Sequence, residues 1–233
     1  MSLPWLMTAL PREHGQFRPL KVSVLRRVPA AWRCRVDDRE FLLAETGMGG
    51  IQATRTLEDL SQSGLPRYVF LAGFAGALHP ELRVGAPILA DAVVGPDGIS
   101  HPATLLLSLP YAHGTLLTSD RLIGSPADKR RLAETTGAVA VDMETSYVAA
   151  WCERRGVPWG CLRVVTDAAA TPVSKDVFDL LENGHVSPWR LTKALLRRPA
   201  IVSELLALGR ATATAAKVIA EALTMAIEEG PIV

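Results

Sequence analysis

The residues best suited to chemistry gather between residues 138 and 170, in AVAVDMETSYVAAWCERRGVPWGCLRVVTDAAA. Asp142 and Glu144 follow a short apolar run, and Asp167 ends a second one. Arg163 lies inside that second run. The spacing of the apolar residues predicts strand, helix and strand. A helical connection favours parallel strands, so we expect the acids at the sheet edge where α/β proteins bind ligands.

This cluster of charges has two interpretations. An isolated charge inside an apolar strand is costly, so Arg163 requires an acidic partner. The simpler interpretation is a salt-bridged arginine beside acids that cap the intervening helix. The alternative is a binding site that collects carboxylates from separate strands.

Two segments, VDMETSYVA and GVPWGCLRVVTDAA, resemble the nucleoside phosphorylase and nucleosidase superfamily. Its members carry a D/E-M-E element at a helix start and an R-x-x-S/T-D element at a strand end. The resemblance covers roughly residues 3 to 170. It implies a three-layer α/β fold in which helices flank a twisted, mixed central sheet. The 233 residues suit one domain, 1–233, with a helical C-terminal extension from about residue 171.

Cleavage of a purine nucleoside leaves an electron-rich base and a ribose that becomes positively charged. Within the family pattern, Asp167 is the candidate acid for the leaving base. Glu144 is the candidate acceptor of a hydrogen bond from the ribose 2′-hydroxyl group. Arg163 lies four residues before Asp167, so an ideal strand points both side chains to one face. We expect the arginine to hold the acids in place.

The resemblance also assigns roles near the N-terminus and beside the ribose. Glu13 matches the glutamate of a T-A-L-x-x-E pattern that activates water in hydrolytic members. From the residues alone, Glu13 would be interpreted as a solvated loop acid. Met143 is expected to pack on the ribose.

Three further motifs are expected to border the substrate. Gly47 and Gly49 match the family's T-G-x-G loop, which lies against the ribose or phosphate, and glycines before a helix N-terminus can receive an anion or a hydroxyl group. Phe74 stands where many members carry serine or threonine. Leu122, followed by Ile123, replaces an aromatic residue that packs on the base. Both changes indicate a more apolar site.

Composition excludes several classes of function. The formal net charge is +1, which gives no reason to expect a nucleic-acid partner. The three cysteines have neither disulfide nor metal-site spacing, so we expect no metal, no cofactor and a reducing cytoplasm. No apolar run reaches the ~18 residues of a membrane span. The N-terminus lacks the charged region of a signal peptide.

The C-terminal third has a different character. Residues 175–198 and Ile201–Ile227 are expected to be helical, the second with one broad apolar face. Packing across the sheet is the simplest role for that face, and a homodimer surface is an alternative. Basic residues and leucines between Trp189 and Arg198 also suit contact with lipid headgroups at the inner membrane.

The remaining elements follow from alternation and turn residues. The expected strands are Leu3–Leu10, Lys21–Val28, Ala31–Val36, Glu40–Glu45, Tyr68–Ala72, Leu82–Val94 and Gly114–Thr118, with a helix from about Gly50 to Ser63 and irregular structure over 95–113.

The resemblance therefore implies an enzyme that cleaves the N-glycosidic bond of an adenosyl nucleoside with water as the acceptor. The C-terminal third is similar to bacterial members associated with hopanoid synthesis, which act on an adenosylhopane. Phosphorolysis, with phosphate as a second substrate, and a soluble methylthioadenosine/S-adenosylhomocysteine nucleosidase are alternatives. A catalytically inactive nucleoside-binding protein is the alternative from another class. A dinucleotide-binding protein is disfavoured, because the loop at Gly47 lacks a third glycine.

Overall fold

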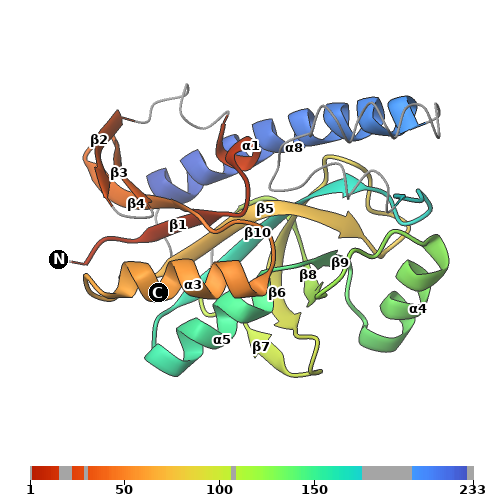
Figure 1. Ribbon diagram of the computed structural model, residues 1–233, viewed down its shortest axis with the longest axis horizontal. Helices are drawn as coiled ribbons and strands as arrows, with labels where there is room; N and C mark the ends of the chain where they lie inside the picture. Colours follow the sequence, from red (N-terminus) through yellow and green to blue (C-terminus); the bar gives the residue numbers. More distant parts are fainter. Residues whose placement is uncertain (1, 16–22, 29–30, 106–108, 175–200, 230–233) are drawn as a thin grey trace.

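The computed structural model describes residues 2–15, 23–28, 31–105, 109–174 and 201–229 (Figure 1). Its elements, in chain order, are β1 (Trp5–Thr8), α1 (Pro11–His14), β2 (Ser23–Val28), β3 (Ala31–Val36), β4 (Arg39–Glu45), α3 (Gly50–Ser61), β5 (Val69–Ala77), β6 (Pro87–Val94), β7 (Ser100–Pro102), β8 (Ala112–Thr118), α4 (Pro126–Thr136), β9 (Ala140–Asp142), α5 (Thr145–Arg155), β10 (Trp159–Asp167) and α8 (Ile201–Glu229). The helix expected over 175–198 lies outside the described residues.

The ten strands of the described residues form one mixed sheet. β5 and β10 pair in parallel, with Trp159 opposite Val69. On the other side, β5 pairs in parallel with β1 and β1 with β4, and then β4, β3 and β2 form an antiparallel meander. The strands β10, β6, β8, β9 and β5 close into a ring, because β10 pairs with both β5 and β6.

Helices cover both faces of the sheet and give three layers (Figure 1). Because side chains alternate along a strand, β5 contributes to both interfaces. Val69 and Leu71 pack into the core that contains Leu57 of α3, whereas Phe70 packs into the core that contains Ile219 of α8. The three-layer α/β fold with a mixed sheet, predicted from the sequence, is confirmed.

The expected C-terminal helix is present as α8. Its buried residues Ala215, Ile219 and Leu223 recur every four positions and pack on the sheet. Towards its N-terminus the helix is more open, and Leu206 is 56% exposed. Among the described helices, none combines the length and the apolar character needed to cross a membrane.

One prediction about the sheet is wrong, because β9 and β10 are antiparallel. β9 pairs antiparallel with the end of β5, where Val141 lies opposite Gly76, while β10 runs parallel to β5. The three residues of β9 pair in parallel with β8, β8 pairs in parallel with β6, and β6 runs antiparallel to β10. Asp142 at the end of β9 and Glu144 just after it therefore reach Arg163 of β10 from a strand that runs in the opposite direction.

β5 also continues to Ala77 instead of ending at Ala72. The small residues of this extension have low strand propensity, but pairing with β10 and β9 keeps them extended. The segment expected to be irregular contains the short strand β7, and β8 begins at Ala112. The extension of β5 is the most important of these differences, because Arg163, Glu13 and Asp167 pack against its backbone.

Candidate functional site

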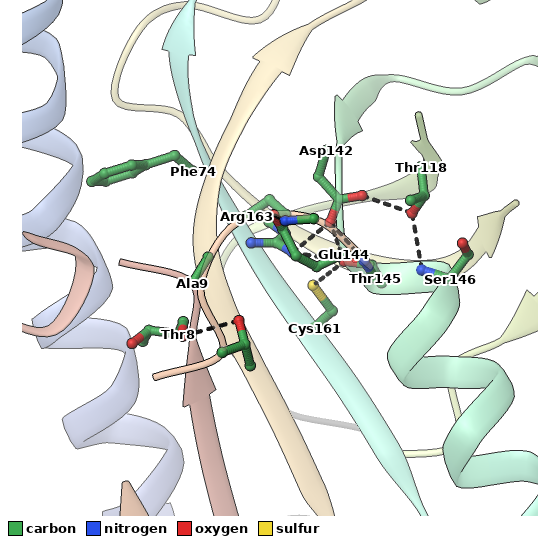
Figure 2. Close-up of polar contacts among 12 residues, drawn as sticks. Thr8, Ala9, Phe74, Thr118, Asp142, Glu144, Thr145, Ser146, Cys161 and Arg163 are labelled. Carbon is green, nitrogen blue, oxygen red and sulfur yellow. Dashed lines mark hydrogen bonds and ion pairs between the residues drawn. The ribbon is translucent and has the colours of Figure 1, made fainter. Parts of the chain in front are cut away.

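A fully buried arginine lies at the centre of the charged cluster (Figure 2). Arg163 projects from β10, and its Nη2 is ion-paired with Asp142 Oδ2 and lies 3.4 Å from Glu144 Oε2. The same nitrogen donates a hydrogen bond of 2.9 Å to Thr145 Oγ1. Burial alone would lower the pKa of the guanidinium group, but Asp142 and its neighbours raise it above its usual range. The arginine therefore carries its charge in the interior.

Asp142 connects the arginine to the start of α5. Its Oδ2 accepts hydrogen bonds from the backbone N and the hydroxyl group of Thr145, and its Oδ1 accepts one of 2.7 Å from Thr118 Oγ1. The Thr118 hydroxyl group in turn accepts a bond from Ser146 N at 2.9 Å. Asp142 thus has the salt-bridging and helix-capping role of the simpler interpretation, which explains part of the cluster.

Glu144 connects the same arginine to the glycine loop before α3. It is buried, and its Oε1 accepts a 2.8 Å hydrogen bond from Gly49 N. Gly49 has a φ of 88°, a left-handed conformation that favours glycine, and Gly47 has a φ of 74°. Burial raises the pKa of Glu144 to about 7, although Arg163 acts against the shift. Glu144 is therefore in direct contact with the glycine loop.

Glu13 is held from the N-terminal side of the site. Its side chain is buried rather than solvated, and Oε2 accepts hydrogen bonds from Ala9 N at 2.6 Å and Leu10 N at 2.8 Å. Oε1 accepts a bond of 2.9 Å from Phe74 N. Burial raises the pKa of Glu13, and the charge of Arg163 and these three amides oppose the shift. A loop acid in solvent would have none of these contacts.

Gly73 in β5 brings Glu13 and Arg163 together. A Cβ atom built on this glycine would collide with Arg163 Nη1 and lie 2.7 Å from Glu13 Oε1. Both groups therefore lie against the same stretch of backbone. Nη1 and Nε of Arg163 are buried and have no hydrogen-bond partner among the described residues. Nη1 is therefore an unused hydrogen-bond donor beside the Glu13 carboxylate.

Asp167 does not contact these acids. Its Oδ2 lies 2.5 Å from Lys129 Nζ, and the side chain covers Gly76, where an added Cβ would be 2.9 Å from Oδ2. The even spacing from Arg163 fails as a guide, because the register with β5 shifts between Val165 and Asp167. This bulge breaks the alternation on which the expectation of a shared face depends.

A cavity of about 560 Å³ adjoins Asp167. It lies between the segment 166–173 and the exposed part of α8, and Val84, Pro172 and Leu208 contribute apolar walls. Ser174 donates a 2.7 Å hydrogen bond to Glu204 of α8, which ties the two sides together. The volume falls in the range that is typical of small-molecule sites.

The other predicted substrate contacts lie in different surroundings. Phe74 gives the site its backbone N–H, while its ring packs with the α8 core and points away from Arg163 (Figure 2). Ile123 is buried in a small core beside α4, and Leu122 and Met143 are half-buried. Among the described residues, no group of three potential ligands could hold a metal ion.

Sequence reasoning missed Lys129, Gly73 and Thr145. Lys129 lies in the charged run ADKRR, where nothing distinguishes a buried lysine from its exposed neighbours. Gly73 directly precedes Phe74 in the sequence, but only the fold shows which side chains need its missing Cβ. Thr145 directly follows D-M-E and could have been considered as a polar partner of the arginine.

Comparison with known proteins places the chain in a family. A family profile described as the phosphorylase superfamily matches residues 30–106 and 102–197. The 5′-methylthioadenosine/S-adenosylhomocysteine nucleosidase of Staphylococcus aureus is 25% identical over 189 residues, which cover 69% of this chain and 83% of the relative.

Solved structures share the fold at low sequence identity. The Helicobacter pylori 5′-methylthioadenosine/S-adenosylhomocysteine nucleosidase matches with a TM-score of 0.73 at 16% identity, over 98% of each chain. The futalosine hydrolase of the same species has the same TM-score, identity and coverage. The family profile covers more than half of the chain. The chain therefore belongs to the phosphorylase superfamily and is an enzyme of its nucleosidase and phosphorylase class.

Proposed function

We propose that this enzyme releases the base of a purine nucleoside by cleaving its N-glycosidic bond, with water as the acceptor. The observation that carries the proposal is the arrangement along β5. Glu13 and Arg163 lie against Gly73, and Asp167 lies against Gly76. Three strand residues span roughly 10 Å, and their odd separation turns Arg163 and Asp167 to opposite faces of β5, so the nucleoside has to lie across the end of this strand, with its sugar near the arginine cluster and its base near Asp167.

The residues fit the demands of an oxocarbenium-like transition state. As the bond between C1′ and the base nitrogen breaks, its electron pair goes to the base and the sugar becomes positively charged. An ionised Glu144 that accepts a hydrogen bond from a ribose hydroxyl group stabilises this charge more than it stabilises the neutral substrate. Asp167 gives a proton to the base nitrogen.

Glu13 completes the reaction on the opposite face of the sugar. Water attacks C1′ while Glu13 takes one of its protons, so that one water molecule is consumed and the free base and free sugar are formed. The proton on Glu13 then returns through solvent to Asp167. The buried carboxylate and the unpartnered Arg163 Nη1 next to it support a bound water molecule at this position.

Phosphate is the weaker candidate for the acceptor. Three carboxylates, those of Asp142, Glu144 and Glu13, influence the single guanidinium group. An incoming phosphate dianion would meet this excess of negative charge, whereas water would not. The relative from Staphylococcus aureus and the fold relative from Helicobacter pylori are also named as nucleosidases.

The substrate is proposed to be an adenosyl compound. The names of the relatives point to 5′-methylthioadenosine and S-adenosylhomocysteine. The apolar walls of the cavity beside Asp167 support a second candidate, an adenosyl lipid such as adenosylhopane. The basic segment that suits a membrane contact lies outside the described residues. The single-domain organisation, homodimer, cytoplasmic location and peripheral membrane contact stay predictions.

Substitution of the proposed acid and base tests the reaction. We expect Asp167→Asn and Glu13→Gln each to lower the rate of adenine release from 5′-methylthioadenosine by about 10²–10⁴-fold, because each removes a proton-transfer group. The exposed Glu134→Gln on α4 is the matched control and should keep full activity. Base release measured with and without phosphate identifies the acceptor. Equal rates in wild type and Asp167→Asn would contradict the assignment.

The pH dependence tests the role of Glu144. Because its pKa is raised to about 7 and the carboxylate is the active form, kcat/KM should increase as the pH rises through about 7. The free energy of unfolding should change in the opposite sense. Because the pKa of Glu144 is raised in the folded protein, its contribution to stability is fully present below about pH 4.5 and is lost as the pH rises through about 7. Glu144→Gln should remove both dependences. A wild-type profile without this step would exclude the proposed role.

Substrates of rising 5′ hydrophobicity distinguish the two substrate candidates. A series of 5′-alkylthioadenosines, from methyl to long-chain alkyl, changes only the group that is expected to enter apolar space. If the lipid candidate is correct, KM should fall steadily along the series, because each buried CH₂ contributes about 0.8 kcal/mol. Leu208→Asp at the cavity wall should weaken this trend. A KM that rises with chain length would exclude the lipid candidate.

A further inference from the structure

Lys129 of α4 is a fully buried lysine with no assigned role. Its side chain has no exposure to solvent, whereas its neighbour Arg130 is exposed. Lysine is almost never fully buried unless its charge is paired. The ammonium group lies 2.5 Å from Asp167 Oδ2 and donates hydrogen bonds to the carbonyl oxygens of Ala168 at 3.0 Å and Thr171 at 3.4 Å.

These contacts use the whole hydrogen-bonding capacity of the ammonium group. A lysine has three N–H donors, and each of the three acceptors belongs to the end of β10 or the segment that follows it. Lys129 itself is fixed near the start of α4, where Ser125 caps the helix. The lysine is therefore a rigid link between α4 and the segment that carries Asp167.

We propose that Lys129 is a positioning residue for protonation of the leaving base, which it supports by fixing Asp167 and the segment 168–171 at the end of β10. The proposal rests on the proposed function, in which Asp167 is the acid. Lys129 occupies Oδ2, and Oδ1 accepts a 3.2 Å hydrogen bond from Thr166 Oγ1. In this proposal the transferred proton is carried on Oδ1, the oxygen that is not paired with the ammonium group.

The charge of the lysine acts on the transition state. When Oδ1 gives its proton to the base nitrogen, the O–H bond breaks, an N–H bond forms and Asp167 becomes a carboxylate. A fixed ammonium group beside Oδ2 stabilises the negative charge that develops there. A preorganised partner of this kind needs no rearrangement during the reaction, so its effect falls mainly on kcat.

Lys129 also controls where the carboxyl group of Asp167 lies relative to the substrate. Asp167 and the segment 168–171 contribute to the wall of the cavity of about 560 Å³. A catalytic group displaced by about 1 Å can lose 10²-fold in rate. Removal of the lysine would leave the carboxylate and two backbone carbonyls without their shared partner, so the acid would lose both its position and its charge partner.

The test compares two leaving groups in a set of variants. Lys129→Met keeps the side-chain length without charge, Lys129→Arg keeps the charge, and Arg130→Met is the exposed control from the same helix. Each is assayed with 5′-methylthioadenosine and with the 4-nitrophenyl riboside that carries the same 5′ group, whose phenolate leaves without a proton. Circular dichroism and thermal unfolding establish that each variant is folded.

We expect Lys129→Met to lower kcat for 5′-methylthioadenosine by about 10²-fold, with little change in KM, and to keep most of its activity on the nitrophenyl substrate. Lys129→Arg should recover part of the loss, and Arg130→Met should match wild type. Equal losses on both substrates, or no loss at all, would overturn the proposal. If Lys129→Met does not fold, the ratio of the two activities in Lys129→Arg decides in the same way.

A wild-type protein that releases no adenine from any adenosyl substrate in the series would instead contradict the proposed function. An Asp167→Asn variant that loses activity while Lys129→Met does not would leave the function intact and remove only the role of the lysine. The two failures are therefore distinguishable in one set of measurements.

Discussion

The site depends on the cost of keeping one guanidinium group in the interior. Arg163 is fully buried, and an uncompensated charge there would be prohibitive. Asp142 and Glu144 compensate it from the chain that enters α5, and Glu13 approaches from the N-terminal side. Because these acids come from distant parts of the sequence, neutralising the arginine also brings together the beginning and middle of the chain. Burial raises the pKa of Glu144 to about 7, although Arg163 acts against the shift, and this places the group in the range where a change of charge can be used.

The strand beneath the charges sets their spacing. β5 is extended past Ala72 by pairing on both sides, and its glycines give room to Arg163, Glu13 and Asp167. A bulge in β10 then turns Asp167 out of the alternation that governs Arg163. This separation divides the proposed work, with the sugar at the arginine cluster and the base at Asp167. Lys129 pairs with Asp167, whereas Asp142, Glu144 and Glu13 share Arg163.

The sequence predicted which residues form the candidate site better than it predicted how those residues are arranged. The motifs D-M-E and R-V-V-T-D contain Glu144, Arg163 and Asp167, so short stretches of sequence were enough to select these residues. The same motifs predicted a parallel pair of strands and a shared face, and both expectations are wrong. The direction of β9 depends on its antiparallel pairing with β5. The face on which Asp167 lies depends on a bulge in β10. Neither feature follows from spacing along the chain. The burial of Lys129 depends on tertiary packing in the same way and carries no local signal.

A crystal structure of the protein with an uncleaved adenosyl transition-state analogue tests the central claim most directly, because it places the ligand on β5. The account predicts that the sugar hydroxyl groups bind Glu144, that the base nitrogen lies within hydrogen-bonding distance of Asp167, and that a water molecule bridges Glu13 and Arg163 Nη1. An analogue bound away from the backbone between Gly73 and Gly76, or with its base turned towards Glu144, would contradict it.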